Sequence, residues 1–222
     1  MLNPTPSEPT KSLLTPGEFA ITTNEFWETQ WSERGARTFL TDLLHRRSYG
    51  PNGFHARLFR RVAPGVFDGA KIIELGGASS RLLVDFAKNN NAQVTAVDYS
   101  DTGVAQTKEL FQREGLNGEV LHEDIFKWAA GGVDRSFDVV THWGLLEHFA
   151  DPEPIMKISA NLVRPGGKVV FTMPNLGAKG VSLWRRYSPE NLKAHVYHDD
   201  QAIAASARAA GLVLEKKFHC GA

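Results

Sequence analysis

The sequence is poor in cysteine, carries no net charge and contains no long apolar run. Cys220, the one cysteine among 222 residues, cannot form an internal disulfide and lacks metal-ligand spacing, which is consistent with a reducing cytoplasm. The 25 basic and 25 acidic residues balance, so no overall field draws the chain to nucleic acid or to an anionic membrane. No apolar run approaches transmembrane length, and the N-terminus lacks the apolar core of a signal peptide. We therefore expect a cytoplasmic protein without a nucleic-acid or membrane partner.

The length of the chain and the distribution of its prolines indicate one large domain with an N-terminal extension. A chain of 222 residues can bury one large core and an added helical segment. Residues 1–20 contain four prolines and little to bury, which predicts a disordered tail. In residues 21–62 aromatic and aliphatic side chains recur at helical spacing, so a helical cap interrupted near Gly35 is expected. Residues 63–222 are expected to form the main domain.

Apolar runs alternate with helical patterns through the main domain. The expected strands are 71–75, 93–98, 118–122, 137–142, 167–173 and 212–219, and the expected helices are 80–90, 102–114, 153–163 and 199–210. Such alternation favours parallel strands joined by right-handed crossovers. The predicted fold is therefore α/β and doubly wound, with a mostly parallel sheet, helices on both faces and an N-terminal helical extension.

A glycine turn between the first two expected strands predicts a nucleoside site. Residues 71–81 read KIIELGGASSR, and the next strand ends on Asp98, which could accept both ribose hydroxyls if the two strands are neighbours. A pyrophosphate cofactor requires glycines where this turn has Ala78 and Arg81, so NAD and FAD fit poorly. S-adenosylmethionine has no phosphate, and its cationic sulfonium and ammonium groups suit an acid such as Glu74.

The chain resembles the seven-stranded class I methyltransferases over roughly residues 55–220. The resemblance is carried by IELGGASS (73–80), VDYS (97–100), HEDIF (122–126), FDVVTHWGLLEH (137–148) and LVRPGGKVV (162–170), in this order and spacing. It implies S-adenosylmethionine as cofactor, with Glu74 and Gly76 at its methionine end, Asp98 at the ribose, Tyr99 at an adenine face, and Asp124 with Ile125 at the adenine edge. Gly77 and Ala78, in the same turn as Gly76, are also expected to bind the cofactor. The family usually has glycine at the positions of Ala78 and Ser80. It also normally adds an antiparallel seventh strand, whereas here the sequence ends soon after the expected sixth strand.

Each acid of this set also has an ordinary structural interpretation. Glu74 could be a solvated strand end, Asp98 a helix N-cap and Asp124 a turn former, because Asp often has such roles. All three acids occur at the ends of expected strands, and this shared placement favours the functional interpretation. Trp27 and Trp31, four residues apart, could close the cofactor pocket, and the alternative is ordinary core packing.

The methyl acceptor is expected to bind beside the carboxyl end of the fourth strand. His142, which ends that strand, is the first candidate for a general base and for a place in the cofactor pocket, and His195 is the second candidate base. A hydrogen-bonded structural role is the alternative for His142. The long connection 175–200, with Trp184, Arg185 and Arg186, is expected to cover the site and select the acceptor.

Three classes of function remain open from the sequence. A methyltransferase acting on an oxygen or nitrogen atom of a small molecule is favoured, because the connection 175–200 offers a lid with aromatic and cationic groups. The alternatives are a methyltransferase acting on RNA or protein, and a non-catalytic cofactor-binding domain. No metal is expected, because His195 and His198 lack a third ligand at convincing spacing. A homodimer is left open as the oligomeric state.

Overall fold

The structure, a computed structural model, describes residues 20–34, 51–132 and 136–219, with only the backbone described at 51–53. Nearly all of the predicted tail, Gly35 with the expected helix beyond it, and Cys220 lie outside these residues. The strands are β1 (Lys71–Leu75), β2 (Gln93–Asp98), β3 (Glu119–His122), β4 (Phe137–Trp143) and β5 (Val163–Thr172). The helices are α1 (Asn24–Arg34), α3 (Pro51–Val62), α4 (Arg81–Asn90), α5 (Asp101–Glu114), α6 (Ile125–Ala130), α7 (Glu153–Leu162), α8 (Val181–Tyr187), α9 (Pro189–Lys193), α10 (Asp200–Ala209) and the short 3-10 helix η2 (Leu146–His148).

The five strands form one parallel sheet in the order β3-β2-β1-β4-β5. Helices α3, α4 and α5 contribute to the core on one face, where Ile72 of β1 is fully buried. Helices α6, α7 and α10 contribute to the core on the other face, around Ile73 and Val140. The apolar runs of β1 and β2 are buried on both faces, as expected of central parallel strands. The predicted doubly wound α/β fold is confirmed.

Several helices begin where a side chain caps their free N–H groups. Ser80 accepts a hydrogen bond from Leu83 N at the start of α4, and Ser100 accepts one from Gly103 N at the start of α5. Asp124 caps α6 by accepting from Phe126 N and Lys127 N. Because α4, α5 and α6 directly follow β1, β2 and β3, these caps fix the turns at the carboxyl ends of the strands. Those turns are where ligands bind in open α/β sheets.

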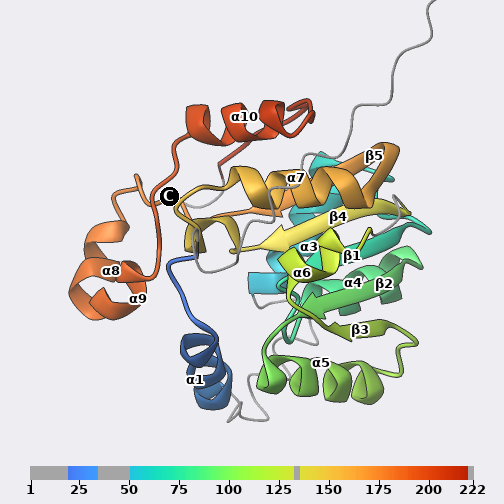
Figure 1. Ribbon diagram of the computed structural model, residues 1–222. Coiled ribbons are helices and arrows are strands. Elements are labelled where there is room, and N and C mark those ends of the chain that lie inside the picture. Colours follow the sequence, from blue (N-terminus) through green and yellow to red (C-terminus); the bar gives the residue numbers. More distant parts are fainter. Residues whose placement is uncertain (1–19, 35–50, 133–135, 220–222) are drawn as a thin grey trace, which may run out of the picture.

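The remaining elements lie beyond the carboxyl ends of the strands. Figure 1 shows α1, α8 and α9 on that side of the sheet. Ile21 N donates to His148 O at 2.9 Å, and Gln106 of α5 donates to Trp31 O at 2.9 Å, so α1 is tied to both η2 and α5. No helix among the described residues is long and apolar enough to cross a membrane.

The predicted strand at 212–219 is wrong, because these residues form no ladder with β5. The segment does lie beside β5, where Lys168 pairs with Glu215 at 2.5 Å, and it continues to α3, where Lys216 donates to Val62 O. Val213 and Leu214, which produced the apolar pattern, are 85% and 50% exposed. An apolar run becomes a strand only if its backbone finds a partner and its side chains a surface to cover, and here the side chains remain in solvent. A groove of about 1370 Å³ lies between this segment and β5.

Candidate active site

The turn from β1 into α4 has the backbone geometry of a ligand-binding turn. Gly76 has φ +65°, a left-handed conformation that favours glycine. A Cβ on Gly77 would lie 3.1 Å from both the Ala96 side chain and Glu74 O, so glycine at position 77 lets the turn pass close to β2 without a shift of these neighbours. The carboxyl end of β1 therefore presents bare backbone beside β2, as the glycine pattern predicts.

Glu74 is almost fully buried directly below this turn. Its side chain is 3% exposed and accepts a hydrogen bond from Ser80 Oγ at 2.5 Å. Burial raises the pKa of the Glu74 carboxyl to about 8, and the Ser80 hydrogen bond opposes that rise. No salt bridge to Glu74 is found within the described ranges. Ser80, which departs from the family's usual glycine, thus joins Glu74 to the first turn of α4.

The second departure from the family pattern, Ala78, is accommodated by a glycine in another helix. A Cβ on Gly103 of α5 would lie 2.7 Å from the Cβ of Ala78, closer than two such atoms can approach. Gly103 thus provides the space that a glycine at position 78 would otherwise provide. The turn keeps its compact shape, although one of its usual glycines is absent.

Asp98 ends β2 opposite the turn and is a second buried carboxylate. Its Oδ2 accepts from Ala78 N at 3.2 Å and its Oδ1 from Ser100 N at 2.9 Å. Burial raises the pKa of Asp98 to about 6 against these hydrogen bonds, and the nearby charge of Glu28 raises it further. Glu28, on α1, accepts from Thr102 N at 3.2 Å. The sequence analysis missed Glu28, because nothing in the sequence places α1 beside α5.

Tyr99, Asp124 and Ile125 follow the carboxyl ends of β2 and β3, which pair in register as far as Asp98 and His122. Tyr99 is half-buried, and desolvation together with the charge of Asp98 raises the pKa of its hydroxyl. Asp124 has the capping role described above, and Ile125 packs into the core of its face. The structure thus brings the expected adenine-side residues to one edge of the sheet, and their contact with a cofactor stays a prediction.

Trp27 and Trp31 stack on each other along α1, with ring centroids 6.3 Å apart. Trp27 also meets the His148 ring edge-on at 4.8 Å, and the C–H edge of Trp31 lies close to Gly103. Both rings are half-buried beside the turn and η2. Their position over the carboxyl edge of the sheet is compatible with the predicted role of closing the cofactor pocket. That role stays a prediction.

His142 is buried in a way that makes it a weak base. Its side chain is 0% exposed and stacks on Phe171 at 5.0 Å, and neither ring nitrogen has a hydrogen-bond partner among the described residues. Burial lowers the pKa of the His142 imidazole to about 3. The geometry therefore favours the second candidate, His195, which is only half-buried. Burial lowers the pKa of the His195 imidazole as well, and its hydrogen bond to Asn191 O opposes that shift.

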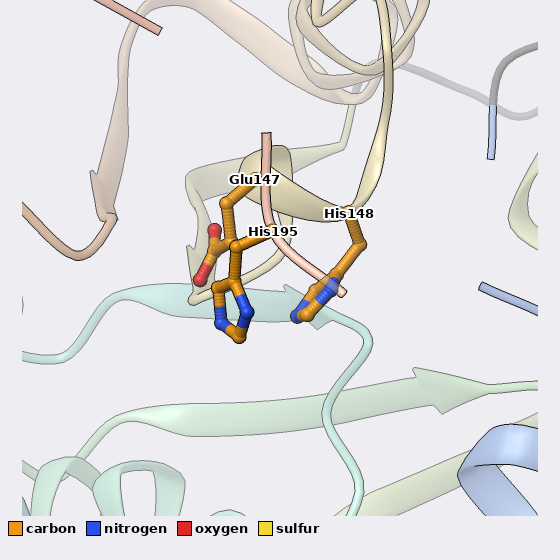
Figure 2. A group of neighbouring side chains, drawn as sticks. All are labelled: Glu147, His148 and His195. Atoms are coloured by element: carbon orange, nitrogen blue, oxygen red, sulfur yellow. The ribbon is translucent and has the colours of Figure 1, made fainter. Parts of the chain in front are cut away.

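His195 belongs to a cluster with two residues of η2, Glu147 and His148. Figure 2 shows the three side chains projecting side by side, two from η2 and one from the segment after α9. Their ligating atoms lie within 4.8 Å of one another. The predicted lid is pinned here, because Val196 N donates to Glu147 O at 2.6 Å and the His198 ring bonds Phe149 O at 2.9 Å. The sequence analysis treated Glu147 and His148 as family architecture, since only the fold brings them to His195.

These features place a glycine turn with two buried acids, Glu74 and Asp98, beside a polar cluster at the carboxyl edge of an α/β sheet. The profile of a methyltransferase domain family matches residues 43–217, so the chain belongs to that family. This match confirms the predicted class I methyltransferase resemblance, the enzyme class and S-adenosylmethionine as the family's cofactor.

Individual relatives share parts of the chain. The ubiquinone biosynthesis O-methyltransferase of Stutzerimonas stutzeri (strain A1501) is 32% identical over 112 residues, which are 50% of this chain and 47% of the relative. The chain thus spans about half the length of such relatives. The structure of an O-methyltransferase family protein from Burkholderia thailandensis aligns with a TM-score of 0.58 at 18% identity, covering 88% of this chain and 67% of that one.

The fold by itself does not determine the reaction. The cyclase SpnF aligns with a TM-score of 0.55 at 20% identity, covering 70% of this chain and 56% of that chain. A protein named for ring formation therefore shares the fold with proteins named for methyl transfer. The choice of reaction and acceptor has to be argued from the residues of the site.

Proposed function

We propose that this chain transfers the methyl group of S-adenosylmethionine to an oxygen atom of a small molecule. The observation that carries the proposal is the pair of buried acids, Glu74 and Asp98, at neighbouring strand ends and without an ion-pair partner among the described residues. A positively charged nucleoside relieves the cost of burying such acids, because an opposite charge nearby favours the ionised carboxylate. Oxygen is preferred to nitrogen because the S. stutzeri relative is named an O-methyltransferase.

The cofactor is proposed to lie across the ends of β1, β2 and β3. Glu74 receives the cationic methionine end and Asp98 the ribose hydroxyls, while α1 covers the bound cofactor. The remaining proposed cofactor contacts are Gly76, Gly77, Ala78, Tyr99, Asp124, Ile125, Trp27 and Trp31. His142 is left out of the proposed catalytic group because it is fully buried and stacked on Phe171.

The acceptor is proposed to bind between η2 and the lid, residues 175–199. The His195 ring donates from Nδ1 to Asn191 O, a contact of 2.7 Å, so its lone pair is on Nε2 and can accept the proton of an acceptor hydroxyl. As the proton leaves, the oxygen attacks the methyl carbon in line with the carbon–sulfur bond, whose electron pair stays on sulfur. Trp184 packs against the His195 ring, with ring centroids 5.0 Å apart, and helps to exclude water.

The proposed setting is a cytoplasmic enzyme without a nucleic-acid partner, as a monomer or homodimer. The test uses S-adenosylmethionine labelled on its methyl group, incubated with the protein and either a metabolite extract or total RNA of the source cell. Label should enter a small molecule, and the Asp98→Ala variant should abolish that transfer at limiting cofactor. Transfer to RNA alone would contradict the acceptor class. Binding of the cofactor without transfer to either pool would favour a non-catalytic domain.

A further inference from the structure

We infer that Glu147, His148 and His195 form a binding site for a divalent transition-metal ion. The cluster offers one carboxylate and two imidazoles, with ligating atoms within 4.8 Å of one another. Figure 2 shows all three side chains extending in the same direction from their backbones, so that their ends converge. Two imidazoles and one carboxylate are a common ligand set for zinc and for non-haem iron in proteins.

Both histidines are already oriented as metal-binding histidines are. His148 Nδ1 contacts Ala194 O at 2.7 Å, and His195 Nδ1 contacts Asn191 O at 2.7 Å. A carbonyl oxygen only accepts, so each Nδ1 carries the proton and each Nε2 carries the lone pair. A backbone carbonyl that fixes the tautomer in this way is the usual support of a histidine that binds a metal through its other nitrogen.

The third ligand is a buried carboxylate whose charge is not balanced by a described cation. Glu147 is 2% exposed, and its Oε2 has no hydrogen-bond partner within the described part of the chain. Gly144 leaves room for the carboxylate, since a Cβ there would lie 2.9 Å from Glu147 Oε1. A bound cation would compensate the buried charge and satisfy the oxygen.

The spacing of the cluster fits a site that closes when the ion binds. Metal–nitrogen bonds of about 2.1 Å in a tetrahedral zinc site place ligand atoms about 3.4 Å apart. Separations of up to 4.8 Å therefore have to shorten by as much as roughly 1.4 Å. Glu147 and His148 are buried on η2, and hydrogen bonds at Ala194 O and Val196 N hold the backbone beside His195 to η2. The adjustment therefore falls mainly on the half-buried side chain of His195. Metal binding would thus add a side-chain link to the hydrogen bonds that already join the lid to η2.

The ion would also take a part in methyl transfer, and this second step rests on the proposed function. Three protein ligands leave at least one coordination position for an acceptor hydroxyl. The site adjoins the turn after β1, since a Cβ on Gly76 would lie 3.1 Å from the side chain of Leu145, which precedes η2. The bound hydroxyl would release its proton to water, and the oxyanion would attack the methyl carbon while sulfur keeps the bonding pair. His195 then acts as a ligand in place of a base.

Binding is tested by titrating the purified full chain with Zn²⁺ by calorimetry and with Co²⁺ by visible spectroscopy. We expect one ion per chain and d–d bands typical of mixed nitrogen and oxygen ligands. The variants Glu147→Gln and His195→Gln should each weaken binding by about tenfold or more, since even supporting residues change metal affinity by that amount. His219→Gln, the same substitution at an exposed histidine outside the lid, is the matched control and should bind as the parent does.

A second readout reports the lid and separates the two steps of the inference. Zn²⁺ should slow amide hydrogen exchange in residues 175–199 of the parent and leave it unchanged in Glu147→Gln. The absence of stoichiometric binding in the parent, or equal binding in parent and both cluster variants, overturns the metal site. Metal binding without any change in methyl transfer overturns only the catalytic step, and transfer that persists in chelator leaves the proposed function intact while removing the metal from it.

Discussion

Replacing Glu74 with glutamine should stabilise the free protein at alkaline pH and weaken its binding of S-adenosylmethionine. Glutamine keeps the size of the side chain and can still accept the hydrogen bond from Ser80, so the substitution mainly removes the charge. In the free protein the ionised carboxylate is buried with no described cation beside it, which is unfavourable. With cofactor bound, the same carboxylate would face a positive charge.

The magnitude follows from proton linkage. The pKa of Glu74 rises from an ordinary 4.5 to about 8 in the folded protein, so between these pH values the folded state holds one proton more than the unfolded state. The free energy of unfolding therefore decreases as pH rises, by about 1.4 kcal/mol per pH unit for this group, and the loss is complete above the folded pKa. Glutamine does not titrate, so the variant lacks this loss. The free energy of unfolding of the variant minus that of the parent should therefore increase with pH by the same amount per pH unit. Asp98 and His142 titrate in both proteins, so most of their contribution to the free energy of unfolding cancels when the parent is subtracted from the variant.

Urea unfolding at several pH values between 5 and 8.5 measures this difference, with Glu215→Gln, the same substitution at an exposed glutamate, as the matched control. Calorimetry with S-adenosylmethionine should show an affinity lower by roughly ten to a hundredfold in Glu74→Gln, as for loss of a charged contact. If the free energies of unfolding of parent and variant change with pH in parallel, the argument that Glu74 is a buried acid without a compensating charge is refuted. An unchanged affinity would remove Glu74 from the cofactor site.

Three further outcomes are expected. Asp98→Ala should weaken S-adenosylhomocysteine binding by roughly ten to a hundredfold in calorimetry, and an unchanged affinity in a folded variant would exclude Asp98 from the ribose site. Gly103→Ala should destabilise the protein by about 1–3 kcal/mol in urea unfolding because its Cβ meets Ala78, and Ala78→Gly in the same chain should restore most of that loss; a destabilisation that persists would locate the strain elsewhere. His142→Leu should keep cofactor affinity and be at least as stable as the parent, because it removes two buried nitrogens without partners, whereas lost binding in a folded protein would return His142 to the pocket.

The central elements of the fold could be predicted because their signals are local. The expected bounds of the first two strands, 71–75 and 93–98, are those of β1 and β2, since both are apolar runs that end at a turn. The predicted segment 212–219 failed for the opposite reason, because a strand at the edge of a sheet depends on a partner that an apolar pattern does not reveal.

Only part of the candidate site could be predicted from the sequence. Glu74 and Asp98 are recognisable because each ends an apolar run that is next to a turn. Glu147 and His195 are 48 positions apart in the sequence, and Glu28 on α1 approaches Asp98 at the end of β2. No rule of sequence spacing connects the members of either pair. The position of His142 at a strand end suggested a general base, but a strand end does not show which neighbours cover the ring. In the structure the ring is fully buried and stacked on Phe171.

The contact between Ala78 and Gly103 restricts the order in which this site could have changed over generations. A lineage with glycine at both positions can acquire alanine at either one, but acquiring it at one position makes the same change at the other damaging. Alanine in the turn is therefore tolerated only in a background where α5 keeps its glycine. Among homologues, a chain with alanine at the position of Gly103 should carry glycine at the position of Ala78.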